Sequence, residues 1–96
     1  MPSEDRLQFI PSADKEWRKL NDATRQRFAK KLVERLIEPH VPSAKLSDMT
    51  GCYKIKLRQS GYRLVYQVIE DIVVVRVIAV GRRSRNAVYK AASQRN

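Results

Sequence analysis

A run of nine residues in the second half of the chain constrains the fold most. The run from Ile72 to Val80 is almost continuously apolar and rich in β-branched side chains, with Arg76 as its one charged residue. Such a pattern is typical of a strand that is covered on both faces, and Gly81 is expected to end it. Because 96 residues suit a single domain, we expect one domain over residues 1–96 with this strand at its centre.

Two amphipathic helices are predicted before this strand. A short strand over residues 6–10 leads into a helix that opens at Pro11, with Ser12 as its N-cap. The second helix extends over residues 23–37, and Pro39 ends it because proline lacks the N–H donor. The Asn21-Asp22 pair breaks the first helix and can cap the second. Apolar residues at helical spacing mark the buried stripes of this helical hairpin: Ala13, Trp17 and Leu20, then Phe28, Leu32 and Leu36, widened by Ala29, Val33 and Ile37. The polar face of the second helix holds Arg25, Gln26, Arg27, Lys30, Lys31, Glu34 and Arg35.

From residue 53 the apolar period changes to two. A strand over residues 53–58, a Gln59-Ser60-Gly61 turn and a return strand over residues 62–69 predict a β-hairpin. Ser84 or Asn86 can cap a short last helix. The element order predicts an α+β fold, with the helical hairpin packed on one face of a mostly antiparallel sheet. The opposite face is then free to carry Lys and Arg.

The positive charge lies mainly in the second half of the chain. The formal net charge is +10, of which residues 1–44 contribute +2 and residues 45–96 contribute +8. A surplus of this size attracts polyanions, and nucleic acid is the expected partner. The alternative is a solvated basic surface that serves solubility alone.

The most distinctive basic feature is a row on the strand over residues 53–58. Lys54, Lys56 and Arg58 alternate with apolar residues, so they point to one face about 7 Å apart. Three like charges in a row repel each other unless water or an anion screens them. A solvated strand face would show the same alternation, but further basic residues and one tyrosine can converge on this row: Lys45 at its rim, Arg63 across the hairpin, and Arg82, Arg83, Arg85 and Tyr89 after the last strand.

Several kinds of site are excluded or disfavoured by the composition. With one Cys and one His, the chain cannot form an internal disulfide or a Cys₄ or Cys₂His₂ zinc site. His40 is expected to be solvated, Cys52 to be a small buried residue, and Glu70-Asp71 to be turn residues. No long apolar run and no signal peptide occur, so we expect a cytoplasmic protein with no membrane contact. Any catalysis must therefore use Lys, Arg and Tyr, which can bind a phosphodiester and stabilise its transition state without a metal.

The longest motifs of the chain resemble the RelE toxins of bacterial toxin–antitoxin pairs. They are the stretches Lys15–Leu20, Lys30–Glu34 and, above all, Cys52–Arg58 followed by Ser60–Ile69, then Val80-Gly81, Arg83–Arg85 and Val88-Tyr89. The resemblance implies a microbial-RNase-like RelE/ParE fold with four strands, and a ribosome-dependent mRNA endonuclease that needs no cofactor. In such enzymes the ribose 2′-hydroxyl attacks the adjacent phosphate.

The resemblance also assigns roles to single residues. Lys54 and Lys56 match the two catalytic lysines of the family, with Lys54 assigned to proton transfer or to its activation. Arg63 and Arg83 match the arginines that stabilise the phosphate, and Tyr89 matches the C-terminal tyrosine that stacks on a base. The family carries a basic residue directly after the Lys-Leu of the loop before this strand, whereas this chain has Ser47 after Lys45-Leu46.

The implied partners are a RelB-like antitoxin, acidic where it binds the toxin, and the 70S ribosome with its 16S rRNA and the message in the A site. Promoter DNA would be contacted only through the antitoxin complex. Two other functions stay open at this point. One is a non-catalytic relative of the same fold that inhibits another target such as DNA gyrase, and the other is an RNA-binding module without chemistry.

Overall fold

The computed structural model describes residues 6–70, 74–82 and 84–95, and its chain forms a mixed sheet with helices on both sides. The sheet has the order β1-β4-β3-β2, with β1 parallel to β4 and the other pairs antiparallel. This is the α+β architecture with a mostly antiparallel four-stranded sheet that the sequence predicts. The elements are β1 Leu7–Phe9, α1 Pro11–Arg18, α2 Asp22–Ile37, the 3₁₀ turn η2 Pro42–Ala44, β2 Cys52–Leu57, β3 Tyr62–Ile69, β4 Val74–Arg82, the 3₁₀ turn η3 Ser84–Asn86 and α3 Ala87–Arg95.

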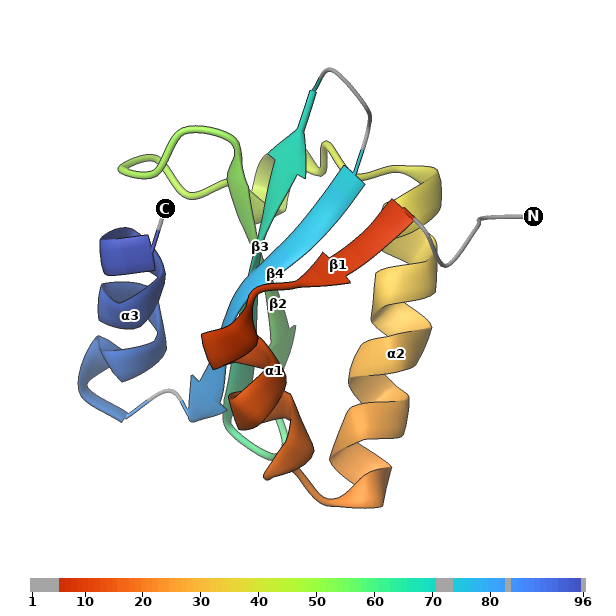
Figure 1. Ribbon diagram of the computed structural model, residues 1–96, viewed down its shortest axis with the longest axis vertical. Coiled ribbons are helices and arrows are strands. Elements are labelled where there is room, and N and C mark those ends of the chain that lie inside the picture. Colours follow the sequence, from red (N-terminus) through yellow and green to blue (C-terminus); the bar gives the residue numbers. More distant parts are fainter. Residues whose placement is uncertain (1–5, 71–73, 83, 96) are drawn as a thin grey trace.

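The larger core lies between α2 and the sheet. Phe28, Leu32 and Leu36 of α2 are buried against apolar side chains of the strands, as their spacing predicts. Trp17 of α1 joins the two helices through a ring contact with Phe28, with centroids 6.3 Å apart. Figure 1 shows α2 on one side of the sheet and α1 below β1, alongside β4.

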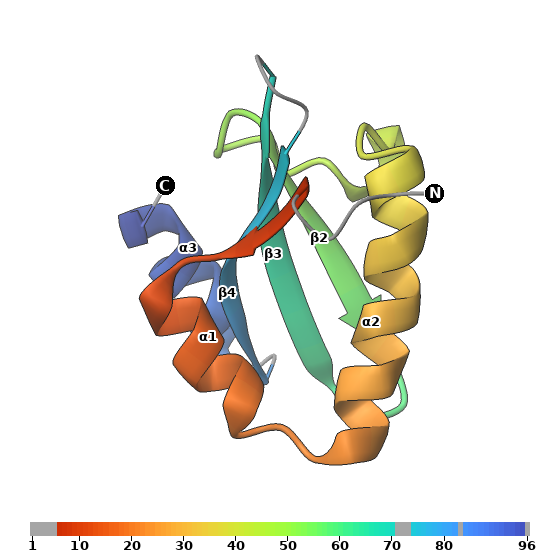
Figure 2. The same ribbon diagram turned by 45° about the vertical axis from the view of Figure 1, so that its right-hand side comes forward.

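A second, smaller core lies on the other side of the sheet, beneath α3. Val88 and Ala92 of α3 pack there against Val65, Ile78 and Ala79 of β3 and β4. The expected free face is therefore covered over part of its area, and β4 is buried on both faces as its composition predicts. Figure 2 shows the strands between α3 and α2.

The ends of several elements differ from the expected ones. The first helix begins at Pro11 with Ile10 as its N-cap and no capping side chain, so the Ser12 cap is wrong. Asn21 does cap α2, because its Oδ1 accepts the Thr24 N–H at 2.8 Å. Strand β4 continues past Gly81 to Arg82, and the expected start of this strand at residues 72–73 lies outside the described residues.

The widened stripe of α2 is the clearest departure in the helices. Ala29, Val33 and Ile37 point to solvent, and the last two are 50% and 72% exposed. Arg35, expected on the polar face, instead turns toward the sheet. Within the described ranges, no helix combines the length and the apolar character that crossing a bilayer requires.

Candidate functional site

An open groove of about 900 Å³ lies on the α3 side of the sheet, between α3 and the strands β2 and β3. Its residues come from the loop before β2, from β2 and its turn, from β3, and from η3 and α3. The lining residues are Leu46, Asp48, Met49, Lys54, Lys56, Arg58, Arg63, Asn86, Tyr89, Lys90 and Ser93. Five of these are the predicted Lys54, Lys56, Arg58, Arg63 and Tyr89, so distant segments of the sequence meet at one place.

The alternation of β2 places its lysines in this groove. Ile55 and Leu57 of β2 belong to the larger core, so Lys54 and Lys56 must point to the opposite face. Lys56 lies directly opposite Arg63 on β3 in the antiparallel register. The predicted cross-hairpin approach of Arg63 to the basic row is therefore confirmed.

Mutual repulsion in this row changes the acidity of one lysine. The pKa of Lys56 is lowered, and the positive charge of Lys54 is the largest cause. Partial desolvation contributes next, followed by the charges of Arg63 and Arg58 and a side-chain hydrogen bond with Lys54. The row thus contains an ammonium group that gives up its proton more readily than an ordinary lysine.

Arg63 forms the buried part of the groove. It is only 7% exposed, and its Nη1 donates to the carbonyl oxygen of Tyr62 at 3.0 Å. On the β4 side it faces Gly81, which has no side chain to compete for the space. A guanidinium fixed in this way can present several N–H donors to a planar or tetrahedral anion.

The wall of the groove opposite the lysines comes from α3. Tyr89 is partly buried against the smaller core, and Lys90 and Ser93 lie beside it along the helix. Asn86 precedes this helix with a φ of +58°, a conformation that Asn tolerates better than most residues. Positions 86, 89, 90 and 93 have the spacing of one helix face. The sequence analysis missed Lys90 and Ser93, although this spacing would have placed them beside Tyr89.

Asp48 is an acid in an otherwise cationic groove. The basic pattern of the sequence around residues 53–63 gives no sign of an acid at this place, but the structure places Asp48 in the lining of the groove. The position of the Asp48 side chain depends on the conformation of the loop before β2. The loop is fixed by backbone hydrogen bonds between Leu46 and Cys52 at 3.0 Å and between Cys52 and Met49 at 3.1 Å.

Arg35 supports the basic strand from the other side of the sheet. Its Nη1 donates to the carbonyl oxygen of Lys54 at 3.2 Å and to the hydroxyl oxygen of Tyr66 at 2.8 Å. The guanidinium carbon also lies 5.6 Å from the centre of the Tyr66 ring. The Tyr66 hydroxyl in turn donates to the carbonyl oxygen of Pro39 at 2.8 Å. The backbone that carries Lys54 is therefore tied to α2 by a charged side chain.

The remaining predicted site residues are not brought to the groove by the described geometry. Arg82 lies over the ring of Tyr62, 5.3 Å from its centre, and Tyr62 packs on the α2 side. Since the two are opposite each other in the sheet, Arg82 faces away from the groove. Lys45 is exposed and does not line it. Arg83 lies outside the described residues, and so does the side chain of Arg85.

Two further expectations concern single residues elsewhere. His40 is exposed as expected, but its Nε2 lies 2.8 Å from a carboxylate oxygen of Glu70. Cys52 is buried, and burial raises the pKa of its thiol, as suits a small packed residue. Within residues 6–70, 74–82 and 84–95, no three His, Cys, Asp or Glu side chains are placed to hold a metal ion.

The groove has the chemistry of a phosphodiester site. Lysine and arginine donors surround one open space, and a tyrosine ring forms part of its wall. Such donors can stabilise the additional negative charge of a pentacoordinate phosphorus, and an aromatic ring can stack on a base.

Comparison with known proteins agrees with this chemistry. A family model described as the ParE toxin of the type II toxin–antitoxin system parDE matches residues 7–87. The chain is 56% identical over 89 residues to the mRNA interferase toxin RelE of Escherichia coli strain K12, covering 93% of this chain and 94% of that protein. It is 54% identical, with the same coverage, to a putative RelE-like toxin protein of Escherichia coli.

Solved structures show the same likeness. A double arginine mutant of E. coli RelE in the free state superimposes with a TM-score of 0.87 at 54% identity, covering 93% of this chain and 94% of that one. The RelE chain of the intact E. coli RelBE toxin–antitoxin complex gives a TM-score of 0.79 at 57% identity, covering 82% of this chain and 96% of that one. The chain therefore belongs to the ParE family of toxins from type II toxin–antitoxin systems, among whose members it is similar to the RelE toxins.

Proposed function

We propose that this protein is the toxin of a type II toxin–antitoxin pair and cleaves mRNA in the A site of the ribosome, which stops translation. The observation that carries the proposal is the groove in which Lys54, Lys56 and Arg63 face Tyr89 across one open space. Two relatives of about the same length, each 56% identical to this chain, are named mRNA interferases. The place of action is then the cytoplasm.

The proposed reaction is an internal transfer at one phosphate of the message. The ribose 2′-oxygen loses its proton and attacks the neighbouring phosphorus, and the bond from phosphorus to the 5′-oxygen of the next nucleotide breaks. The leaving 5′-oxygen gains a proton, so the products are a 2′,3′-cyclic phosphate and a free 5′-hydroxyl. No electrons are exchanged and no cofactor is needed, because charge stabilisation and two proton transfers complete the reaction.

The residues of the groove have separate tasks in this proposal. Arg63 holds the non-bridging phosphate oxygens, and Arg83 shares this task by its position in the family motif. Lys54 activates the proton transfer by lowering the pKa of Lys56, whose ammonium can then protonate the leaving oxygen. Tyr89 stacks on a base and sets the position of the scissile phosphate. Arg58 and Lys90 extend the positive surface along the message.

The partner that controls the toxin is a RelB-like antitoxin with an acidic, amphipathic binding segment. The exposed apolar strip of α2, formed by Ala29, Val33 and Ile37, is a surface that such a segment would cover. The neighbouring Lys30 is exposed and adds positive charge beside the strip. Promoter DNA is contacted through the antitoxin part of the complex.

The test is primer-extension mapping of a message on programmed ribosomes treated with the purified toxin. New ends at codons in the A site are expected with the native protein and should be lost with Lys56→Ala. Lys30→Ala removes the same charge from the exposed face of α2 and should leave cleavage intact. A single 2′-deoxy nucleotide at the cleaved position should also prevent cleavage.

Two outcomes would reject the proposed function. Relaxed plasmid accumulating in cells that express the toxin, with intact message, would identify an inhibitor of DNA gyrase. Stable binding to ribosome-bound message with no new ends would identify an RNA-binding module without chemistry.

A further inference from the structure

The edge of β4 next to β1 is only partly paired. Strand β1 follows β4 from Val75 to Val77, and the Ile10 N–H then donates to the Val77 carbonyl oxygen at 3.1 Å. Strand β4 continues to Arg82, whereas the chain after Ile10 turns into α1. In the described part of the chain, no strand accompanies this edge beyond Val77.

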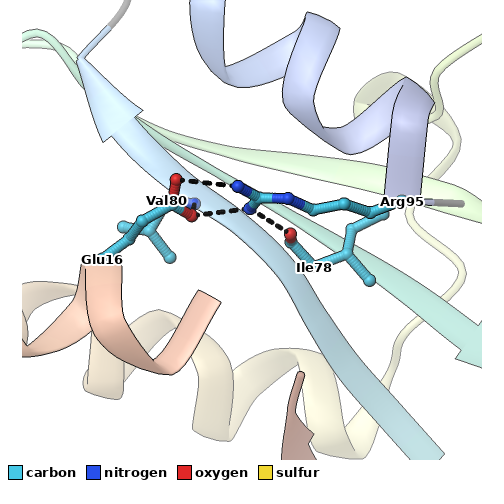
Figure 3. Close-up of polar contacts among 4 residues, drawn as sticks. All are labelled: Glu16, Ile78, Val80 and Arg95. Atoms are coloured by element: carbon cyan, nitrogen blue, oxygen red, sulfur yellow. Dashed lines mark hydrogen bonds and ion pairs between the residues drawn. The ribbon is translucent and has the colours of Figure 1, made fainter. Parts of the chain in front are cut away.

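Two charged side chains occupy the place of the missing strand (Figure 3). Glu16 of α1 accepts the Val80 N–H with its Oε1 at 3.1 Å. Arg95 of α3 donates to the Ile78 carbonyl oxygen at 2.9 Å, and also to Glu16, to Oε1 at 2.8 Å and to Oε2 at 3.3 Å. We call this arrangement the clasp: the Glu16 and Arg95 side chains with the N–H of Val80 and the carbonyl of Ile78.

The clasp is stronger than a typical surface ion pair. The side chains of Arg95 and Glu16 are 25% and 29% exposed, so water screens them less than the Arg18–Asp14 pair, whose side chains are 78% and 41% exposed. The guanidinium contacts both carboxylate oxygens, which restricts the geometry of the two side chains. The clasp also joins the three elements α1, β4 and α3, whereas an ion pair between neighbouring residues of one helix joins none.

Apart from the clasp, helix α3 is held by apolar packing against the smaller core. It contains nine residues, and Val88 and Ala92 are its buried side chains. Isolated helices of this length are unstable in water, so tertiary contacts decide whether and where α3 forms. Its first end follows η3 directly, and its last turn carries Arg95. The clasp is therefore the charged contact that fixes the far end of the helix.

The position of α3 matters because the helix carries one wall of the groove. Tyr89, Lys90 and Ser93 line the groove, whereas Glu16 and Arg95 do not. Any tilt of α3 moves the Tyr89 ring relative to Lys54 and Lys56, which are fixed on the sheet.

We propose that Glu16 and Arg95 are positioning residues for the cleavage reaction: the clasp holds α3 so that Tyr89 and Lys90 face the lysines across the groove. This inference rests on the proposed function in one respect, because the effect of the clasp on the reaction rate can be measured only in a cleavage assay. The effect of the clasp on the position of α3 can be measured without any activity.

The test compares Arg95→Ala, Glu16→Gln and Arg95→Lys with the native protein. Glu16→Gln keeps an acceptor for the Val80 N–H but loses the charge, and Arg95→Lys keeps the charge but loses the two-pronged contact. Arg18→Ala is the matched control, because it removes one positive charge from an exposed pair with Asp14 on α1. Amide hydrogen exchange reports on α3, and protection of the β3 amides shows in the same experiment that each variant is folded.

Faster exchange in α3, with unchanged exchange in β3, is expected for Arg95→Ala and Glu16→Gln. The single-turnover cleavage rate at saturating toxin should fall by about tenfold or more, since small displacements of positioning groups have large effects on rate. The toxin concentration that gives half of the maximal rate should change by less than about threefold, because Arg95→Ala removes one cation of many and Glu16→Gln removes none. Arg95→Lys should restore part of the rate, and Arg18→Ala should behave as the native protein.

The inference is overturned if α3 exchange in Arg95→Ala equals that of Arg18→Ala. It is equally overturned if α3 loosens while the cleavage rate stays the same, since Tyr89 and Lys90 would then not need the clasp. A native protein that fails to cleave would reject the proposed function instead, and the exchange comparison would still decide whether the clasp holds α3.

Discussion

Replacing Arg35 with alanine is the perturbation whose cost follows most directly from the structure. The substitution removes the hydrogen bonds from the guanidinium to the Tyr66 hydroxyl and to the Lys54 carbonyl, 2.8 and 3.2 Å long. It also removes the charge 5.6 Å from the centre of the Tyr66 ring. Tyr66 keeps its bond to Pro39, but the Lys54 carbonyl loses its side-chain partner.

The expected loss is about 3 kcal/mol of unfolding free energy. A hydrogen bond from a charged donor contributes about 1.5 kcal/mol at the lower end of its range, and the longer bond contributes about 1 kcal/mol. A partly solvated cation over an aromatic ring adds about 0.5 kcal/mol. For a chain of this size, such a loss lowers the thermal midpoint by about 12–24 °C, which leaves the domain folded at room temperature.

Urea unfolding followed by circular dichroism measures this loss. The midpoint should fall by about 2 M for Arg35→Ala, with an unchanged slope. Arg27 lies at an exposed position of the same helix, so Arg27→Ala should change the free energy of unfolding by less than about 0.5 kcal/mol. A loss below about 0.5 kcal/mol for Arg35→Ala would refute the reasoning, because the three contacts would then contribute nothing.

Three other predictions concern titration and binding. Lys54→Ala should move the alkaline fall of the single-turnover cleavage rate to higher pH, because the charge of Lys54 is the largest cause of the lowered pKa of Lys56. If this fall does not move between about pH 7 and 10, Lys56 is not the group that protonates the leaving oxygen. Burial raises the pKa of Tyr66, so the protonated hydroxyl contributes fully to the free energy of unfolding below about pH 10, and this contribution is lost as the pH rises through the pKa of the folded state. Urea unfolding should show this loss in the native protein and not in Tyr66→Phe. Val33→Glu should weaken antitoxin binding by about tenfold or more in a calorimetric titration. Ala23→Glu adds the same charge on the exposed first turn of α2 and should leave the affinity unchanged. Equal affinities of the two variants would exclude the apolar strip as the docking surface.

The elements with a strong apolar period could be predicted from the sequence because they fold for local reasons. The alternation of β2 and β3 fixed which residues face the groove, and the antiparallel register then placed Lys56 opposite Arg63. The continuous apolar run of β4 predicted a strand covered on both faces. Strand period and the pairing of strands within a hairpin are short-range properties, so a single sequence carries them.

The sequence-based predictions failed where tertiary packing decides which of several similar side chains is buried. A helix with apolar residues at both sides of its stripe can rotate, and in α2 the buried side includes Arg35 while Val33 and Ile37 face solvent. Arg35 was hidden because its partners, Tyr66 and Lys54, are far away in the sequence. The same holds for the clasp, whose residues are 79 positions apart.

The candidate site was predictable in its sheet part and less so in its loop and helix parts. Arg82 carries the same charge as its neighbours, but its position in the ladder opposite Tyr62 turns it to the other face. Asp48 entered the groove through the fold of an irregular loop, for which charge patterning gives no direction.

The central claim is that the cations of the groove carry out the cleavage, and the most direct measurement is a single-turnover rate on programmed ribosomes at saturating toxin. The comparison is between the double variant Lys54→Ala/Lys56→Ala and the double variant Lys30→Ala/Lys31→Ala, which removes the same charge from the exposed side of α2. We predict a loss of about a thousandfold or more for the first and less than about threefold for the second. Equal losses in the two variants would mean that net charge alone brings the toxin to the message, and would contradict the account.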